Sequence, residues 1–430
     1  MRHSPLYLAL LCTVLLLAAC SGRPASVEAA NRGQRMDVLP PAADAVPVES
    51  TSYSPFPRPA ALEPQIGFWR NVYASWRRSQ VALHDDRYLG LVYEVVDLPG
   101  DIADQYTEEQ KFLVRERREY WQQRLRALAQ NLNGSVPPAA DDQALLAKVE
   151  RVGPLDQVLP GAADRVRAQR GLRERFKRGL EISGRYEGRF RKIFRQHGLP
   201  EEFAYLPHVE SSFQAQARSS AGAVGIWQFT RGAAERFMTI NDLVDERLDP
   251  VASAYGAARY LSYAREQLPN WPLAVTSYNH GIGGMRRARE AVGDDIAQIV
   301  RRYDHPKFGF ASRNFYTEFL AACEIARQPT RFFPEGLHYD PPMDARRAVL
   351  SHPMSVVEVA ASFDVDRADL VALNGGWDAA VRTGQTTLPA GTTVWLPDER
   401  TGRNEPVGVE GWTSRYRALG GGDRVEDYRY

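Results

Sequence analysis

Apolar residues recur at helical spacing along most of the chain, and this feature does most to restrict the fold. Ile66, Trp69 and Tyr73 follow one another at intervals of a helical turn, and so do Phe176 and Leu180 further on. A stripe with this spacing is typical of an amphipathic α-helix that buries one face. Hydrophobic residues make up 44% of the 430 residues, which is enough to build a core. The sequence therefore predicts a mostly α-helical chain of roughly two or three domains.

Charge and cysteine content exclude several classes of function. The formal net charge is +1, so no global field attracts nucleic acid, and no nucleic-acid partner is expected. The cysteines are Cys12, Cys20 and Cys323, and the last lies in an apolar run where a buried, inert thiol is expected. Too few cysteines are present for a Cys-based zinc cluster. We expect neither a metal nor a cofactor.

Residues 1–20 have the pattern of a secretory signal, with Arg2 and His3 followed by an apolar stretch from Leu6 to Ala19. Residues 17–21 read LAACS, which resembles the lipobox of bacterial lipoproteins. That resemblance implies that Cys20 is lipidated and anchors a periplasmic protein to a membrane. A serine rather than an aspartate after the cysteine suggests the outer membrane. An ordinary signal peptide with an incidental cysteine is the alternative.

Composition divides the remainder of the chain. Residues 21–63 are rich in Pro, Ala and Ser, which predicts a tether that does not fold. We expect a helical N-terminal region at 64–197 and a dense helical domain at 198–330, in which Asp249 and Pro250 begin a helix. Short strands at both ends of 344–398 predict a small α/β module, and the polar tail 399–430 is expected to be poorly ordered.

One carboxylate lies on an apolar helix face. The predicted helix carries Phe203, Leu206, Val209 and Phe213 on one side. Glu210 points toward the same side, because it follows Leu206 by about one helical turn. Desolvation raises the pKa of a carboxyl group on such a face, so the group can act as a general acid near neutral pH. A helix-end glutamate that reaches solvent or pairs with an arginine is the alternative.

Two further segments contain groups suited to a polar ligand. Residues 219–229 place Gly222 and Gly225 among small residues, so the backbone there can approach a ligand closely. Trp227 and Phe229 offer flat apolar surfaces for sugar rings, and Gln228 offers an amide. Residues 274–281 end in Ser-Tyr-Asn-His-Gly, which would bring a hydroxyl and an amide to a helix end. Core aromatic residues and an ordinary glycine C-cap are the alternatives.

Taken together, the three segments resemble the catalytic domain of the lytic transglycosylases, and within it the membrane-bound D type. The family pattern is Glu-Ser, then Gly-Leu-Met-Gln, then Ala-Tyr-Asn. Here it reads Glu210-Ser211, then GIWQ at 225–228, then SYN at 277–279. The resemblance is strong over about residues 195–300 and weaker from 64. It implies a lysozyme-like fold for this domain and a helical N-terminal extension.

The resemblance also implies a reaction and a set of site residues. Glu210 would protonate the bond between N-acetylmuramic acid and N-acetylglucosamine in peptidoglycan strands, then deprotonate the muramic 6-hydroxyl to leave a 1,6-anhydro end. Substrate-binding roles fall on Ser211, Ser219, Gln228, Tyr278 and Asn279. The motif set contains no obvious second carboxylate, and the substrate's acetamido group can assist in its place.

Alternative functions stay open at this point. A goose-type lysozyme would use the same Glu210 to hydrolyse the bond, and a degenerate site would leave a lipoprotein that only binds the wall. His208 and Glu210 match the His-x-Glu of zinc deaminases, but that chemistry also needs a Pro-Cys-x-x-Cys pair. His208 and His280 are therefore expected to be structural. The arginines between 165 and 195 fit a solvated helix face, or contact with carboxylates of wall peptides.

The 344–398 module resembles a LysM domain, a fold that binds chains containing N-acetylglucosamine. Residues 356–363 match its first helix, 370–374 precede its central turn, and 391–397 match its closing strand. The usual Gly-Asp-Ser/Thr-Leu turn is absent, and SHPMS stands there at 351–355. That departure puts glycan binding in doubt more than the fold. A small module that only packs on the rest of the chain is the alternative.

Overall fold

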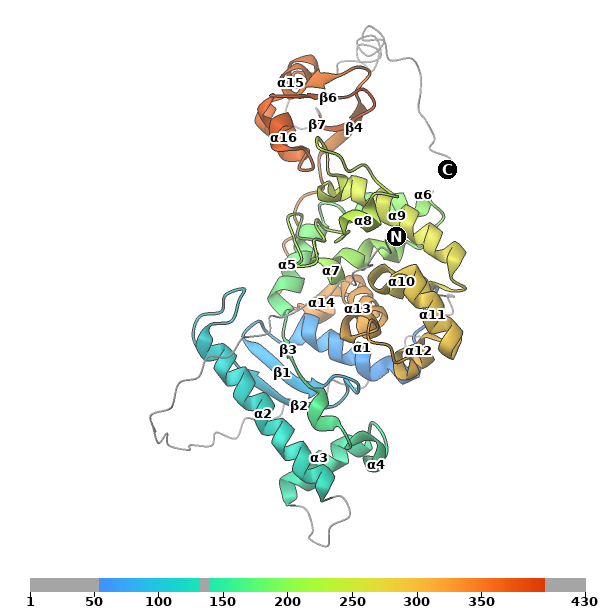
Figure 1. Ribbon diagram of the computed structural model, residues 1–430. Helices are drawn as coiled ribbons and strands as arrows, with labels where there is room; N and C mark the ends of the chain where they lie inside the picture. Colours follow the sequence, from blue (N-terminus) through green and yellow to red (C-terminus); the bar gives the residue numbers. More distant parts are fainter. Residues whose placement is uncertain (1–53, 132–138, 399–430) are drawn as a thin grey trace, which may run out of the picture.

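The computed structural model describes residues 54–131 and 139–398 (Figure 1). The predicted signal sequence, Cys20, most of the tether and the polar tail lie outside the described residues. Helices dominate the described part, which confirms the prediction of a mostly α-helical chain with a small strand-containing module near its C-terminal end. None of the described helices combines the length and the apolar character needed to cross a membrane.

The N-terminal region holds a three-stranded antiparallel sheet in the order β2-β1-β3. Its elements are η1 (Ala60–Leu62), α1 (Glu63–Arg70), η2 (Asn71–Ser75), β1 (Gln80–Asp85), β2 (Val92–Asp97), α2 (Glu108–Gln130), α3 (Ala140–Glu150), α4 (Leu155–Val158), η3 (Ala162–Arg165) and β3 (Val166–Arg170). The prediction of a helical N-terminal region at 64–197 did not include these strands. The central strand β1 is buried on both faces, so it lacks the alternation by which a strand is recognised.

The prediction of an unfolded tether through residue 63 is also wrong for its last ten residues. Phe56 is buried and packs edge-on against Phe203 and Phe319, with ring centroids 5.2 and 5.0 Å away. The Tyr316 hydroxyl donates a hydrogen bond of 2.7 Å to the carbonyl of Pro57. The burial of Phe56 in the core therefore orders this segment despite its Pro-rich composition.

The middle of the chain folds around one large core. Its elements are α5 (Arg173–Ser183), α6 (Glu187–Gln196), η4 (Glu201–Tyr205), α7 (Leu206–Glu210), α8 (Arg231–Ala234), η5 (Glu246–Leu248), α9 (Pro250–Gln267), α10 (Trp271–His280), α11 (Ile282–Val292), α12 (Ile296–Arg302), α13 (Phe310–Arg327) and α14 (Pro329–Phe332). This core includes Ile66 of α1 and Phe176 of α5 beside Phe319 of α13. The predicted boundary between 197 and 198 is therefore not a break in the packing.

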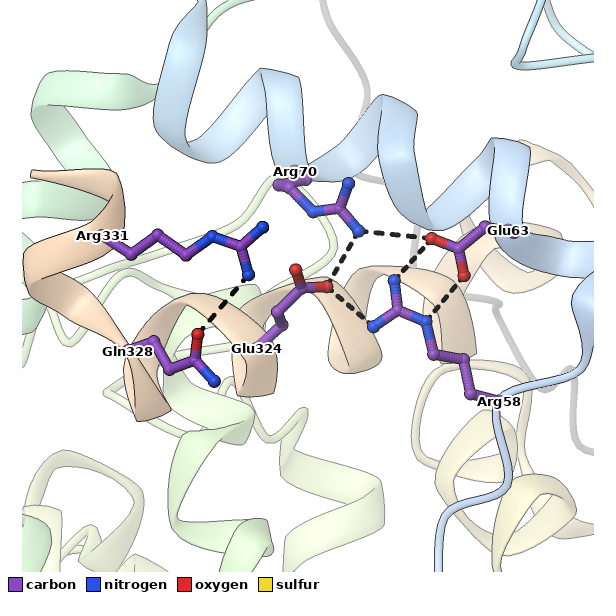
Figure 2. Close-up of polar contacts among 6 residues, drawn as sticks. All are labelled: Arg58, Glu63, Arg70, Glu324, Gln328 and Arg331. Carbon is purple, nitrogen blue, oxygen red and sulfur yellow. Dashed lines mark hydrogen bonds and ion pairs between the residues drawn. The ribbon is translucent and has the colours of Figure 1, made fainter. Parts of the chain in front are cut away.

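Helix α1 lies along α13, and an ion-pair network joins them (Figure 2). Glu324 of α13 accepts hydrogen bonds from Arg58 at 2.7 Å and from Arg70 at 2.9 Å. Both guanidinium groups also contact Glu63. Burial alone would raise the pKa of Glu63, but the Arg58 guanidinium outweighs it and the pKa is lowered. The network therefore fixes the N-terminal helix to the helix that carries much of the core.

We expect Glu324→Gln to lower the free energy of unfolding by about 1–3 kcal/mol, because two guanidinium groups lose a charged partner that is only 16% exposed. Urea unfolding followed by circular dichroism measures the change. The matched control is Glu335→Gln, whose side chain is 43% exposed and pairs with Arg173. That pair should contribute about 0–1 kcal/mol. Equal effects of the two substitutions would contradict the assigned role of Glu324.

The C-terminal module has its own small core. Its elements are β4 (Ala345–Val349), β5 (Met354–Ser355), α15 (Val356–Phe363), α16 (Arg367–Leu373), α17 (Ala379–Thr383), β6 (Thr387–Leu388) and β7 (Thr393–Pro397), with β4 and β7 antiparallel. Trp395 of β7 donates an indole hydrogen bond of 2.6 Å to Asp249. Asp249 also caps α9 through Val251 and Ala252, which confirms the predicted start of that helix. One carboxylate thus serves both the long helix and the docked module.

Candidate active site

Glu210 is the last residue of α7, and its side chain is half-buried. The predicted helix does not continue to Phe213, because Ser212 and Phe213 have φ values of 52° and 60°. Residues other than glycine rarely adopt this left-handed conformation, and it costs about 1–3 kcal/mol where the surroundings impose it. The turn sends Phe213 back into the core and leaves Glu210 at the helix end.

The environment of Glu210 favours its protonated form. Burial raises the pKa of this carboxyl group well above its ordinary value, and the nearby carboxylate of Glu318 raises it further. No described residue forms an ion pair with Glu210 within 4.0 Å. A carboxylic acid that is desolvated and unneutralised can hold a proton at neutral pH and donate it to a leaving group. Glu210 therefore has the electrostatic environment that a general acid requires.

Sequence reasoning missed Glu318, which α13 brings close to Glu210 from far along the chain. Tyr73 of η2 donates its hydroxyl to Glu318 at 3.1 Å. Burial raises the pKa of Glu318 to about 8, against the opposing effects of Tyr73 and Arg167. At neutral pH this group is mostly protonated. The available signal was a lone acid within the apolar run from Phe315 to Cys323.

Ser211, Ser219 and Gln228 shape the loop that faces the Glu-Ser segment. The Ser211 hydroxyl donates to the carbonyl of Ile226 at 2.8 Å, which ties α7 to this loop. The Gln228 amide donates to the carbonyl of Gly225 at 2.8 Å, and its φ is 50°. The Ser219 hydroxyl accepts from the backbone of Ala223 at 3.0 Å. In this structure all three side chains form hydrogen bonds with backbone groups of the loop at residues 219–229.

Tyr278 and Asn279 lie near the end of α10. The Tyr278 hydroxyl donates to the carbonyl of Trp227 at 3.0 Å. Burial, and then the Glu210 carboxylate, raise the pKa of Tyr278 well above its usual value, so tyrosine and glutamate are close in space. The amide oxygen of Asn279 accepts from Ser312 of α13 at 2.8 Å. Three segments separated in sequence therefore meet around Glu210.

The aromatic residues of the loop are not available to sugar rings. Trp227 is fully buried, and its ring lies 5.0 Å from that of Phe190. Phe229 is also buried and packs edge-on against Tyr278. The predicted stacking role of Trp227 and Phe229 is therefore wrong, and the alternative of core aromatics holds. Apolar neighbours compete for these rings more effectively than a solvated sugar does.

The histidines of the motifs have apolar surroundings. His208 is buried between Phe176 and Phe213, and burial lowers its pKa to about 3. Burial also lowers the pKa of His280 to about 4. Both rings are thus neutral at physiological pH. Over residues 54–131 and 139–398, no three His, Cys, Asp or Glu side chains are arranged to hold a metal ion. Cys323 is buried as expected, and burial raises its thiol pKa.

The candidate active site lies within the part of the chain that matches a known family model. Residues 190–300 match the model of the Transglycosylase SLT domain, which covers Glu210, the loop and the end of α10. This stretch of the chain is similar to the lytic transglycosylases. The match begins within α6 and ends within α12, so it leaves out Tyr73 and Glu318. The similarity therefore accounts for the three motifs but not for the second carboxyl group.

Curated relatives agree with this assignment over part of their length. The chain is 35% identical over 170 residues to membrane-bound lytic murein transglycosylase F 2 of Alkalilimnicola ehrlichii, across 34% of this chain and 37% of that protein. It is 27% identical over 191 residues to membrane-bound lytic murein transglycosylase D of Escherichia coli, across 42% and 40%. A putative tributyltin chloride resistance protein of Alteromonas sp. is 34% identical over 145 residues, across 33% and 69%. The chain thus spans well under half of the two transglycosylases.

Proposed function

We propose that this chain is a peptidoglycan lytic transglycosylase that cleaves the β-1,4 bond between N-acetylmuramic acid and N-acetylglucosamine. The observation that carries the proposal is Glu210, a half-buried carboxyl group whose pKa is raised well above normal within the SLT match. Residues 198–330 would carry the activity. The names of the relatives, which are membrane-bound murein transglycosylases, favour peptidoglycan as the substrate.

The proposed reaction needs one proton donor and no water. Glu210 protonates the glycosidic oxygen, and the departing sugar leaves a cationic centre that the muramic acetamido group can stabilise. The Glu210 carboxylate then takes the proton of the muramic 6-hydroxyl, which attacks C1 of the same ring. Because this hydroxyl is tethered to the reacting centre, its effective concentration greatly exceeds that of an untethered nucleophile. The product is a 1,6-anhydro end.

Supporting roles are proposed for the residues around the acid. Tyr278 and Asn279 lie at the end of α10, where a hydroxyl and an amide can contact the sugar next to Glu210. Ser211, Ser219 and Gln228 hold the loop backbone in the structure, so we infer that they position the site or bind sugar after rearranging. Each role is open to test by single substitution with cleavage as the readout.

Glu318 raises the alternative of a hydrolytic lysozyme, because two carboxyl groups can activate a water molecule. A general base must be ionised, however, and burial raises the pKa of Glu318 to about 8. Its hydroxyl partner Tyr73 also occupies one of its oxygens. A protonated Glu318 is a poor base, which supports the reaction that consumes no water.

Mass analysis of the products decides between the two reactions. Purified sacculi are incubated with the full chain, and the released muropeptides are measured. Anhydro ends, each lighter than a reducing end by one water, are the expected result. Ordinary reducing ends would replace the proposal by hydrolysis. If sacculi are bound but not cleaved, the chain is a wall-binding protein without catalysis.

We expect Glu318→Gln to move the alkaline limb of the pH profile to lower pH. An ionised Glu318 raises the pKa of Glu210, so Glu210 stays protonated to higher pH while that charge is present. A neutral amide removes this effect, and the acid form of Glu210 is lost earlier as pH rises. Cleavage rates measured across the pH range test the prediction, with Tyr73→Phe as a comparison that keeps the carboxyl group. An unchanged alkaline limb would contradict it.

We also propose that residues 344–398 form a LysM-like module that binds glycan. The antiparallel pair β4 and β7 with helices α15 and α16 between them in sequence supports this assignment. Val349 and Val357 are large apolar side chains left exposed there, at 43% and 52%. Val357→Asp should weaken retention on chitin if that surface contacts sugar, whereas Phe112→Asp on α2 should not.

We infer that the chain is held at a membrane in the periplasm. The lipobox-like residues 17–21 and the membrane-bound relatives support an anchor at Cys20, and Ser21 favours the outer membrane. Cys20→Ser should release the protein into the soluble fraction of the periplasm. Retention of this variant in the outer membrane fraction would count against the anchor.

A further inference from the structure

A cavity of about 620 Å³ lies between the N-terminal region and α12. Its walls come from α1, the turn between β1 and β2, the turn after α3, and the end of α12. Four arginines line it, namely Arg87, Arg151, Arg301 and Arg302, and no acidic residue does. The SLT match ends at residue 300, so all four arginines lie outside the matched residues, and Arg301 and Arg302 directly follow its end.

Among the described residues, the lining arginines have no acidic partner, whereas several arginines elsewhere in the structure do. Arg165 pairs with Asp85 at 2.9 Å, Arg173 with Glu335 at 2.8 Å, and Arg178 with Asp340 at 2.9 Å. No ion pair joins a lining arginine to a carboxylate anywhere in the described part of the chain. Arg87 instead donates to the carbonyl of Arg301, which brings two like charges together. Unneutralised guanidinium groups around one cavity indicate an anionic ligand.

Gln65 restricts the kind of anion. Its side chain is 9% exposed, lines the cavity, and has an amide oxygen without a hydrogen-bond partner. A buried acceptor of this kind is costly unless a ligand supplies a donor. A sulfate ion has no donor to offer and a phosphate ion offers only O–H groups, whereas a peptide offers several N–H groups beside its carboxylates. Leu89, Val152 and Val300 add apolar walls that suit small alkyl side chains.

One lining residue, Arg87, lies near the first turn of α13. Its charge lowers the pKa of Arg313, although burial is the larger cause. The neighbouring Ser312 donates its hydroxyl to Asn279 at 2.8 Å. A wall of the cavity and the candidate active site therefore both adjoin this segment of α13.

We propose that this cavity binds an acidic peptide, with its carboxylates on the four arginines and a backbone N–H on Gln65. The proposal rests on the proposed function for the source of the peptide, because the stems attached to muramic acid in peptidoglycan carry several carboxylates. Each stem would then be held while the glycan of the same strand lies at Glu210. Stem-bearing strands are accordingly preferred over bare glycan.

Peptide binding by the full chain tests the site without any cleavage. The probe is a fluorescent stem tetrapeptide with free carboxylates, compared with the same peptide after amidation of its carboxylates. We expect the free acid to bind at least about tenfold more tightly, and the double substitution Arg301→Ala with Arg302→Ala to remove most of this difference. The control removes the same charge from the exposed face of α2, with Arg115→Ala and Arg118→Ala. Equal binding of both peptides, or unchanged binding by the cavity variant, overturns the proposal.

Two further measurements are needed. The first distinguishes a peptide from other anions as the ligand, and the second separates peptide binding from the proposed catalytic function. Gln65→Met removes the unpaired acceptor, and it should weaken binding of the peptide, which inorganic phosphate should not displace from the wild-type chain. If phosphate, or vesicles of anionic lipid, displace the peptide at equal anion concentration, the cavity is a general anion site and the proposal fails. The cavity variant should cleave peptide-stripped glycan at the wild-type rate but intact sacculi more slowly. If the wild type cleaves neither substrate, the proposed function fails while the peptide-binding result still stands.

Discussion

Replacing Glu210 by glutamine should reduce cleavage of purified sacculi by about 10²–10⁴-fold, the range that a positioned general acid contributes. Glutamine keeps the size of the side chain and its place at the end of α7, but it can neither donate a proton to the glycosidic oxygen nor accept one from the 6-hydroxyl. Because the raised pKa reflects burial and the Glu318 charge, a neutral amide fits the same environment at no electrostatic cost. Thermal stability should therefore be unchanged or slightly higher.

The control for this experiment is Glu235→Gln, which removes an exposed carboxylate that pairs with Arg231 one turn away. It should leave cleavage at the wild-type rate. Binding to sacculi should survive in both variants, since neither change touches the arginine-lined cavity or the C-terminal module. Turnover by Glu210→Gln within a factor of a few of wild type would remove Glu210 from the mechanism. Loss of binding together with loss of cleavage would instead indicate that the substitution damages the site.

Gly225→Ala should lower the free energy of unfolding by about 3–5 kcal/mol. Gly225 has a φ of 79°, and a Cβ added there would lie 1.9 Å from the backbone carbonyl oxygen of Arg247. The carbonyl oxygen belongs to the backbone and the Cβ is fixed directly to it, so the overlap can be relieved only by separating the loop from the segment before α9. Urea unfolding measures the loss, and cleavage should fall with it.

Gly222→Ala provides the comparison for this substitution. Gly222 lies in the same loop with a φ of 77°, but a Cβ at this position meets no atom within 4 Å. Gly222→Ala should therefore lower the free energy of unfolding by only about 1–2 kcal/mol, the cost of the left-handed conformation. The difference between the two variants isolates the close approach to Arg247. Equal losses would mean that the loop can move away from Arg247 freely, and that its position is not fixed as described.

The features that sequence reasoning found are those encoded within a few neighbouring residues. Glu210 follows an apolar stripe, Tyr278 and Asn279 precede a helix-ending glycine, and Asp249 precedes a proline. Each of these depends on local spacing, which a single sequence displays directly. The catalytic role of Glu210 and the substrate-binding roles are still predictions, because the geometry is compatible with them without testing them.

The features that sequence reasoning missed depend on contacts between distant segments. Glu318 acquires its raised pKa through burial where α13 packs beside α7, and the Tyr73 hydroxyl, which comes from the N-terminal region, opposes that shift. Strand β1 is buried on both faces between β2 and β3, so its sequence has no alternation to mark it. Trp227 appeared suited to a sugar because its flat apolar ring stands next to the Gln228 amide in the sequence, yet the aromatic side chains of α6 enclose it. Burial by a remote partner cannot be inferred from local pattern.

The position of α13 has a practical consequence for expressing the stretch that matches the family model as a separate fragment. The stretch that matches the family model stops at residue 300, ten residues before this helix begins. A fragment trimmed to 190–300 would lose three residues of α13. These are the core residue Phe319, Ser312, which donates to Asn279, and Glu318, which lies near Glu210. The apolar surfaces exposed in this fragment would promote aggregation rather than folding. Gene fragments should therefore run from before Phe56 to beyond Phe333, since the smallest unit with a closed interior is far larger than the recognised motif region.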